Sequence, residues 1–230
     1  MEKGIDFGCI TPEELIGSLN DIEKKFAPKY IFVNGDKNIL QENPKVSVIG
    51  TRNPSLQGKK NAEMLTKFLV KNKIIIVSGL ALGIDTIAHK TAIESGGRTV
   101  AVLGTPLDKC YPYENRKLQE EIMNKHLVIS QFAIGNPVHP SNFPIRNRTM
   151  ALISDASIII EAKDGSGTYH QGWEALRLGR PLFIVEDILK DKSLKWPEKL
   201  INYGAKILPM KHLEIILDVI PVSEVSFNEK

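Results

Sequence analysis

The stretch IIIVSGLALGIDTIAHKTAIE, residues 74–94, decides the fold. It opens with an apolar run, which is typical of a strand that is covered on both faces of a sheet. The chain then turns at Gly79 and Gly83 and continues in a helical pattern that turns Ile84, Ile87 and Ala88 inward. A buried strand, a glycine-rich turn and a helix form the repeating unit of a doubly wound parallel sheet.

The same unit repeats along the chain. The sequence predicts six nearly apolar strands, at Val46–Gly50, Ile74–Ser78, Thr99–Leu103, Leu127–Gln131, Ser157–Glu161 and Pro181–Val185. Helices are expected between them, near Lys59–Lys71, Asp85–Glu94 and Asn115–Asn124, from about Arg148, and near Tyr169–Leu178. The predicted fold class is therefore α/β, with a doubly wound, mostly parallel sheet in one domain over residues 1–230.

The two ends of the chain differ from this repeat. Residues 1–45 are expected to be an extension packed on the sheet, with a helix that starts at Thr11-Pro12 and a strand at Tyr30–Asn34. Near the other end, helices at Ser193–Tyr203 and Lys211–Val219 would flank a strand at Ala205–Leu208. We expect the tail, residues 223–230, to fray.

Composition excludes several classes of protein. The 230 residues are 42% hydrophobic and 25% charged, as in ordinary globular domains, and carry a net charge of +3. This mild charge permits a nucleic-acid partner but requires any basic patch to be local. No apolar run could span a bilayer, and the first residues do not resemble a signal peptide. Cys9 and Cys110 lack metal-ligand spacing, so we expect two reduced thiols in a cytoplasmic protein and no metal site. We also expect no cofactor.

Unusual residues gather where the predicted strands end, which is where ligands bind in such sheets. The first turn contains Gly50 and Arg52 ahead of a helix whose N-terminal N–H groups could hold an anion. Arg52 could add a charge-assisted contact to that anion, or it could bond loop carbonyls and stabilise the turn. Both interpretations remain open on the sequence alone.

The second turn, Ser78–Asp85, is neither a dinucleotide fingerprint nor a P-loop, because its glycines are four apart and no Gly-Lys-Ser/Thr follows. Its small residues would let a backbone or a ligand approach closely, and we count Ser78, Gly79 and Gly83 among the candidate phosphate-binding residues. Asp85 could cap the helix or contact a ligand, and we favour the cap. His89 lies four residues later on the same face, so an Asp85–His89 hydrogen bond is expected, in a structural role.

Aromatic and cationic residues mark the third and fourth turns. Tyr111 and Tyr113 follow the third strand and could stack on bases or pack a loop, of which we favour packing. Phe143 begins the stretch FPIRNR, in which it could offer a stacking surface or plug the loop. If a helix starts near its middle, one of Arg146 and Arg148 would face the cleft and the other would brace the loop.

The fifth turn is again rich in glycine. It runs from Asp164 through Ser166, Gly167 and Thr168 into a helix, an arrangement that favours anion binding. We therefore expect this turn to bind phosphate.

These stretches together resemble the DNA-processing protein A (DprA/Smf) family. The matching segments are VIGTR at 48–52, VSGLALGIDTIAH at 77–89, GRTVAVLG at 97–104, Tyr111-Pro112, and FPIRNR at 143–148. The resemblance implies an extended Rossmann-like fold that binds single-stranded DNA with little sequence preference, forms a homodimer and hands the DNA to a RecA-type recombinase during natural transformation. It also implies that the DNA groove is lined or supported by Arg52, Gly79, Gly83, Phe143, Arg146 and Arg148.

The chain departs from that family in two respects. It has little room for the N-terminal helical and C-terminal winged-helix domains that many members carry. Its fifth turn is similar to the Gly-Gly-x-Gly-Thr-x-x-Glu motif of nucleotide phosphoribohydrolases of the LONELY GUY type. Gln171 stands at the position of their glutamate, and an amide cannot do a carboxylate's proton chemistry. Glu174 could substitute if it shares the same helix face.

Three hypotheses follow from these residues. The leading one is a non-enzymatic protein that binds single-stranded DNA in one furrow on which Arg52, Arg146 and Arg148 converge. The alternative is a hydrolase of nucleoside monophosphates that uses the turn Gly165–Thr168. The third is a nucleotide sensor with the same pocket and no turnover.

Overall fold

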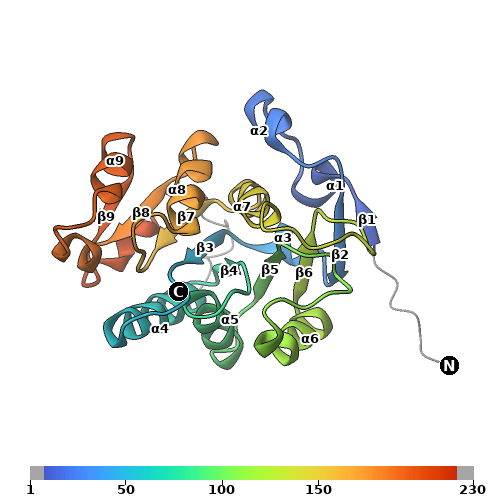
Figure 1. Cartoon of the computed structure of the whole chain (residues 1–230), viewed down its shortest axis with the longest axis horizontal. Coiled ribbons are helices and arrows are strands. Elements are labelled where there is room, and N and C mark those ends of the chain that lie inside the picture. Colours follow the sequence, from blue (N-terminus) through green and yellow to red (C-terminus); the bar gives the residue numbers. More distant parts are fainter. Residues whose placement is uncertain (1–7, 222–230) are drawn as a thin grey trace, which may run out of the picture.

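The computed structural model describes residues 8–221, and within them nine strands form one sheet in the order β1-β2-β6-β5-β4-β3-β7-β8-β9 (Figure 1). The parallel strands are β3 (Lys45–Ile49), β4 (Ile75–Ser78), β5 (Thr99–Leu103), β6 (Leu127–Ser130), β7 (Ala156–Ile159), β8 (Leu182–Val185) and β9 (Lys206–Leu208). The chain winds outward from β3 in one direction through β4, β5 and β6, and then returns to place β7 on the other side of β3. The doubly wound, mostly parallel sheet that the sequence predicts is therefore confirmed.

The residues before β3 extend this sheet. β2 (Ile31–Gly35) pairs antiparallel with β6, and β1 (Gly8–Ile10) pairs antiparallel with β2. Helices α1 (Pro12–Ile16), α2 (Asp21–Phe26) and α3 (Ile39–Glu42) lie around them. The segment before β3 thus joins the sheet at its edge through β2, whose alternate residues are buried and which continues the ladder beyond β6.

Helices cover both faces of the sheet. On one face lie α4 (Leu56–Lys71), α5 (Ile84–Glu94) and α6 (Arg116–Lys125), while α7 (Asn142–Leu152), α8 (Gly167–Arg177) and α9 (Trp196–Asn202) lie on the other (Figure 1). Short 3₁₀ turns occur at Tyr113–Asn115, Glu186–Lys190 and Leu213–Ile216. The carboxyl ends of the parallel strands therefore meet at one edge, from which the loops to these helices depart.

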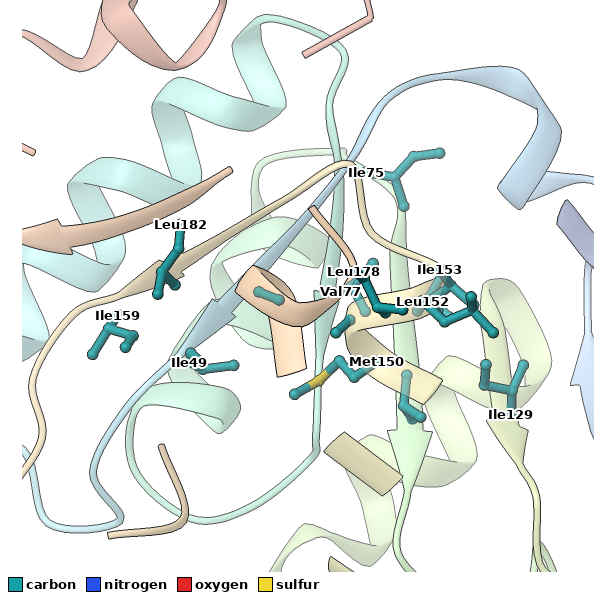
Figure 2. Close-up of a cluster of buried hydrophobic side chains, with 14 of the residues drawn as sticks. Ile49, Ile75, Val77, Ile129, Met150, Leu152, Ile153, Ile159, Leu178 and Leu182 are labelled. Atoms are coloured by element: carbon teal, nitrogen blue, oxygen red, sulfur yellow. The ribbon is translucent and has the colours of Figure 1, made fainter. Parts of the chain in front are cut away.

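The core consists of apolar side chains on both faces of the sheet. Figure 2 shows part of the cluster beneath α7 and α8, where Met150 and Leu152 of α7 meet Ile49, Val77 and other strand residues. A second cluster lies under α4 and α5, and a third lies under α6. Strands buried on both faces need apolar residues at nearly every position, which is why the sequence shows runs instead of alternation.

Most element positions follow the sequence, but several helix bounds do not. The predicted strands lie within two residues of the observed ones. Helix α7 starts at Asn142, six residues before the predicted start, with Pro144 in its first turn, where proline needs no hydrogen-bond donor. The helix expected at Lys211–Val219 is only the 3₁₀ turn Leu213–Ile216. The predicted frayed tail lies outside the described residues.

Candidate functional site

A small pocket lies at the carboxyl edge, where the chain leaves β3, β4 and β5. We call it the carboxyl-edge pocket. It has a volume of about 60 Å³. Its lining comes from three of the turns singled out in the sequence, together with the first turn of α7: Arg52, Gly79, Ala81, Leu82, Tyr111, Pro112 and Phe143.

Two aromatic rings form one wall of the pocket. The ring centroids of Tyr111 and Phe143 are 5.4 Å apart and their planes are tilted by 51°. Phe143 rests on Gly104, where a Cβ would come within 2.6 Å of its ring, so the loop accepts the ring only because residue 104 is glycine. Tyr111 is 49% exposed. Phe143 therefore anchors the loop and also supports an exposed ring that a base could stack against.

Arg146 lies beneath this pocket instead of in it. Its Nη1 donates hydrogen bonds to the main-chain oxygens of Gly79 and Val102, each at 2.6 Å, and its Nε donates to Asn147 Oδ1 at 3.1 Å. Arg146 is only 7% exposed, and a Cβ at Gly79 would overlap its guanidinium. Of the two arginines in FPIRNR, Arg146 is therefore the one that braces the loops.

A buried carboxylate faces the same turn. Asp85 Oδ2 accepts from the N–H groups of Gly79 at 3.1 Å and Ala81 at 3.4 Å. Burial raises the pKa of Asp85, and the charge of Arg146 opposes that shift; burial likewise lowers the pKa of Arg146, and Asp85 opposes it. The two charges hold the Gly79 turn between them. The expectation that Asp85 caps α5 is corrected, because the N-cap residue is Gly83. Residue 83 must be glycine, since its φ is positive (78°) and a Cβ there would overlap the main-chain oxygen of Thr51.

Asn115 belongs to this site, although nothing in the sequence marks it as a site residue. Its Nδ2 donates to the main-chain oxygen of Leu80 at 2.9 Å and lies 2.8 Å from Thr86 Oγ1. It thereby provides a hydrogen-bond donor for the carbonyl of Leu80, a residue whose φ is positive (57°). An isolated asparagine before a helix gives no sequence signal for a partner 35 residues away.

His89 has the structural role expected of it, whereas Ser78, a candidate for phosphate binding, is buried and joins two strands instead. His89 is fully buried and its Nδ1 lies 2.7 Å from Thr99 Oγ1, which in turn donates to the oxygen of Ile76. The expected Asp85–His89 hydrogen bond is not formed, because Asp85 accepts from the main-chain N–H groups of Gly79 and Ala81 instead. Ser78, also fully buried, donates from Oγ to the oxygen of Val48 at 2.7 Å and so ties β4 to β3.

The N-terminus of α4, expected to hold a ligand anion, is occupied by the protein's own carboxylate. Glu161, just past β7, accepts from the N–H of Ser55 at 3.1 Å and from its Oγ at 2.8 Å, and Ser55 Oγ caps Gly58 N–H at 3.0 Å. A Cβ at Gly58 would overlap Glu161 Oε2. The carboxylate that follows β7 thus supplies the negative charge that stabilises this helix N-terminus. Arg52 remains exposed at the rim of the pocket.

Gly50 serves close packing in the same region. A Cβ there would lie 2.5 Å from Ile84 Cγ1 of α5. The first and second turns can therefore meet only because residue 50 is glycine.

Arg148 lies elsewhere, so the single furrow of three arginines is not formed. It is two residues from Arg146 on a helix and therefore points to nearly the opposite side. Its Nε is 3.3 Å from Glu174 Oε1 of α8, and its guanidinium lies over the ring of Phe26. The helix begins before both arginines, so they lie on different sides of α7 and do not converge with Arg52.

The fifth turn is joined to α7 by Asn147, whose Nδ2 donates to the oxygen of Gly167 at 3.3 Å. Gly167 has open space where a Cβ would be, and Ser166 Oγ is buried without a hydrogen-bond partner among the described residues. Thr168 is buried. The turn is open at Gly167, but Ser166, Gly167 and Thr168 are absent from the lining of the carboxyl-edge pocket.

Neither Gln171 nor Glu174 can replace the catalytic glutamate of the nucleotide phosphoribohydrolases. Gln171 is 1% exposed and is an amide. Glu174 is 9% exposed and is held by Arg148 at 3.3 Å and Arg177 at 3.4 Å. Glu174 therefore does not stand free to replace the missing glutamate, although the helix spacing allowed it.

The comparisons with known proteins identify the class. The family model described as DNA recombination-mediator protein A matches residues 12–220, and the chain belongs to this family. The DNA processing protein DprA of Streptococcus pneumoniae is 41% identical over 182 residues, which are 79% of this chain and 64% of that protein. The Bacillus subtilis protein of that name is 34% identical over 202 residues, 88% of this chain and 67% of its own length. The chain thus spans about two thirds of these relatives.

Solved structures agree with this assignment. The structure of DprA from Streptococcus pneumoniae superposes with a TM-score of 0.77 at 35% identity, covering 92% of this chain and 74% of that one. DNA processing protein A from Helicobacter pylori, described with a single-stranded DNA binding mode, gives a TM-score of 0.80 at 27% identity and covers 96% and 100% of the two chains. A molybdenum cofactor binding protein from Rippkaea orientalis, 20% identical with a TM-score of 0.52 and covering 77% and 96%, shares the fold.

Over 8–221, no helix is both long enough and apolar enough to cross a bilayer. In the same range, His, Cys, Asp and Glu side chains do not gather in a group of three that could ligate a metal.

Proposed function

We propose that this protein binds single-stranded DNA at the carboxyl-edge pocket without catalysing a reaction on it. The observation that carries the proposal is the combination of an exposed cation, Arg52, with the tilted rings of Tyr111 and Phe143 around one pocket. Phosphate contacts and base stacking are the two interactions that hold single strands with little regard to sequence. Family membership and the single-stranded DNA described for the Helicobacter pylori relative support the same ligand.

The size of the pocket favours a strand over a free nucleotide. Pockets that enclose small ligands usually hold roughly 300–1,000 Å³, and the carboxyl-edge pocket holds about 60 Å³. A larger hollow of about 320 Å³ lies beside α4, but three carboxylates line it, from Glu161, Asp187 and Asp191. Those charges would repel a nucleotide's phosphate. The other hollow in this region, of about 500 Å³, shares Arg52 and Leu82 with the carboxyl-edge pocket, so the two hollows together suit an extended strand better than a single nucleotide.

Arg146 contributes to this site through its charge and its hydrogen bonds. Its guanidinium is buried below Gly79, close enough to Arg52 that the charge of Arg52 helps to lower its pKa. The buried carboxylate of Asp85 offsets part of this charge, so the main contribution of Arg146 is to hold the Gly79 turn that lines the pocket. In this proposal Arg52 contacts phosphate, and Arg146 is a positioning residue.

A binding titration tests the proposal. The full chain is titrated with a single-stranded oligonucleotide, a duplex of the same sequence and a nucleoside monophosphate, each at two salt concentrations. We expect the single strand to bind most tightly. We expect Arg52→Ala to weaken that binding and to reduce the salt slope by about 0.7, the value for one lost phosphate contact.

Arg148→Ala is the matched control, because Arg148 is another partly exposed arginine outside the pocket. Tighter binding of the monophosphate than of the oligonucleotide would favour a nucleotide sensor. Release of free base from any nucleoside monophosphate would favour the hydrolase alternative. Equal binding by the parent and Arg52→Ala would overturn the assignment of Arg52.

The family resemblance extends the proposal to partners. We infer a cytoplasmic homodimer that protects single-stranded DNA in transformation and passes it to a RecA-type recombinase. Light scattering of the purified chain at several concentrations tests the dimer. Recombinase filament assembly on DNA pre-coated with a single-strand-binding protein, with and without this chain, tests the hand-over; unchanged assembly would contradict it.

A further inference from the structure

A second hollow adjoins the carboxyl-edge pocket. It has a volume of about 500 Å³ and lies between the starts of α4 and α5. Arg52 and Leu82 line both hollows, so these two side chains form the ridge between them. The remaining lining comes from Asn53, Pro54, Lys59, Gly83, Thr86 and Ile87. We call this second hollow the α4–α5 groove.

Charge distinguishes the α4–α5 groove from the hollow on the opposite side of the α4 N-terminus. The groove is lined by two cations, Arg52 and Lys59, and by no carboxylate. The opposite hollow, of about 320 Å³, is lined by three carboxylates and by Lys163 and Lys190, of which Lys190 is paired with Asp187. A phosphodiester chain that leaves the carboxyl-edge pocket past Arg52 therefore meets attraction on one side and repulsion on the other.

Lys59 is available for such a contact. It lies in the first turns of α4, its side chain is exposed, and within residues 8–221 it forms no ion pair. Leu82, which is 37% exposed, offers an apolar surface on the ridge between the hollows. An apolar ridge can contact a base of a single strand, and a cation beyond the ridge can contact the next phosphate.

We propose that the bound strand continues from the carboxyl-edge pocket over Arg52 and Leu82 into the α4–α5 groove, where Lys59 contacts a further phosphate. This inference rests on the proposed function and adds to it a direction for the strand and a second cationic contact. The occupant is the next stretch of the same strand. It follows that the affinity for an oligonucleotide depends on whether it is long enough to reach Lys59.

The experiment measures binding of oligothymidylates of increasing length, from about four to about sixteen nucleotides, to the full chain and three variants. Lys59→Ala is expected to bind the shortest oligonucleotides like the parent. On the longer ones it should bind about three- to fivefold more weakly at physiological salt, with a salt slope reduced by about 0.7. Lys60→Ala, the next residue on the same helix, is the matched control and should bind all lengths like the parent. Lys190→Ala, in the opposite hollow, should do the same.

Each contrary outcome has a distinct meaning. If Lys59→Ala matches the parent at every length, or if Lys190→Ala weakens binding in its place, the strand does not enter the α4–α5 groove and the inference is overturned. An equal loss on short and long oligonucleotides would place Lys59 in the first contact and would also overturn it. If the parent binds no single strand at all, the proposed function itself fails.

Discussion

Nη1 of Arg146 donates a hydrogen bond to the main-chain oxygen of Gly79 at 2.6 Å, at a point where the Cβ of any other residue at position 79 would collide with the guanidinium. The arginine therefore depends on the glycine for space, and the turn depends on the arginine to satisfy its carbonyl. Both residues lie under the proposed DNA site, so a substitution of either should also affect DNA binding.

Gly79→Ala should destabilise the protein because a methyl group must displace a buried side chain. Overpacking of this kind costs about 1–3 kcal/mol of unfolding free energy. Chemical denaturation of the parent and the variant measures it. Gly167→Ala is the control, since its Cβ would meet open space, and it should unfold like the parent. Equal stability of Gly79→Ala and Gly167→Ala would contradict the close approach seen here.

Arg146→Ala should lower stability by about 3–5 kcal/mol, because it leaves Asp85 buried without its opposing charge. Arg146→Lys keeps a charge but lacks the planar fork that reaches Gly79 and Val102 from one side chain, so it should recover only part of the loss. The denaturant midpoints of the parent, Arg146→Ala and Arg146→Lys give the order of their stabilities. A lysine variant as stable as the parent would show that charge alone is sufficient.

Tyr111→Ala should weaken binding of single-stranded DNA by about 1–3 kcal/mol if one base stacks on that ring. Tyr111→Phe should bind like the parent, because stacking needs the ring and not the hydroxyl. Tyr113→Ala is the control, since Tyr113 is more exposed (70%) but does not line the pocket. Similar losses for Tyr111→Ala and Tyr113→Ala would assign stacking to a different surface.

Glu161→Gln should reduce the unfolding free energy by about 1 kcal/mol. The amide keeps the shape, but it loses the charge that the α4 N-terminus and its bonds to Ser55 favour. Glu94→Gln, at the exposed C-terminal end of α5, should leave stability unchanged or slightly raised. Thermal unfolding at low salt, where helix-dipole effects are largest, compares the two. A more stable Glu161→Gln variant would refute the capping role.

His89 should make the protein less stable in acid. Burial, aided by the charges of His126 and Arg146, lowers the pKa of His89 to about 3, while an unfolded histidine titrates near 6.5. Between these values the unfolded chain binds a proton that the folded protein does not. The unfolding free energy therefore falls as pH drops from about 6.5 toward 3, by up to about 1.4 kcal/mol per pH unit.

His89→Gln should flatten that dependence, which denaturation across this pH range would measure. The exposed His139 supplies the control, because His139→Gln should keep the slope of the parent. Parallel curves for His89→Gln and the parent would mean that other groups cause the acid sensitivity.

The strands and the edge at which the pocket lies could be predicted from the sequence, because buried parallel strands leave apolar runs that end at glycine-rich turns. The pairing of charges at that edge could not. Glu161 and Ser55 are 106 residues apart, and Asn115 reaches a turn 35 residues before it, so neither contact leaves a local pattern. The role of Arg148 depended on where α7 begins, and Pro144 in its first turn concealed that start.

Glu161 has one further consequence. Because a side chain from the protein already fills the end of α4, the N–H of Ser55 is not free for a small anion from solution. The fold thus neutralises this helix from within, and Arg52, exposed on the other side of the turn, is left for ligands from outside.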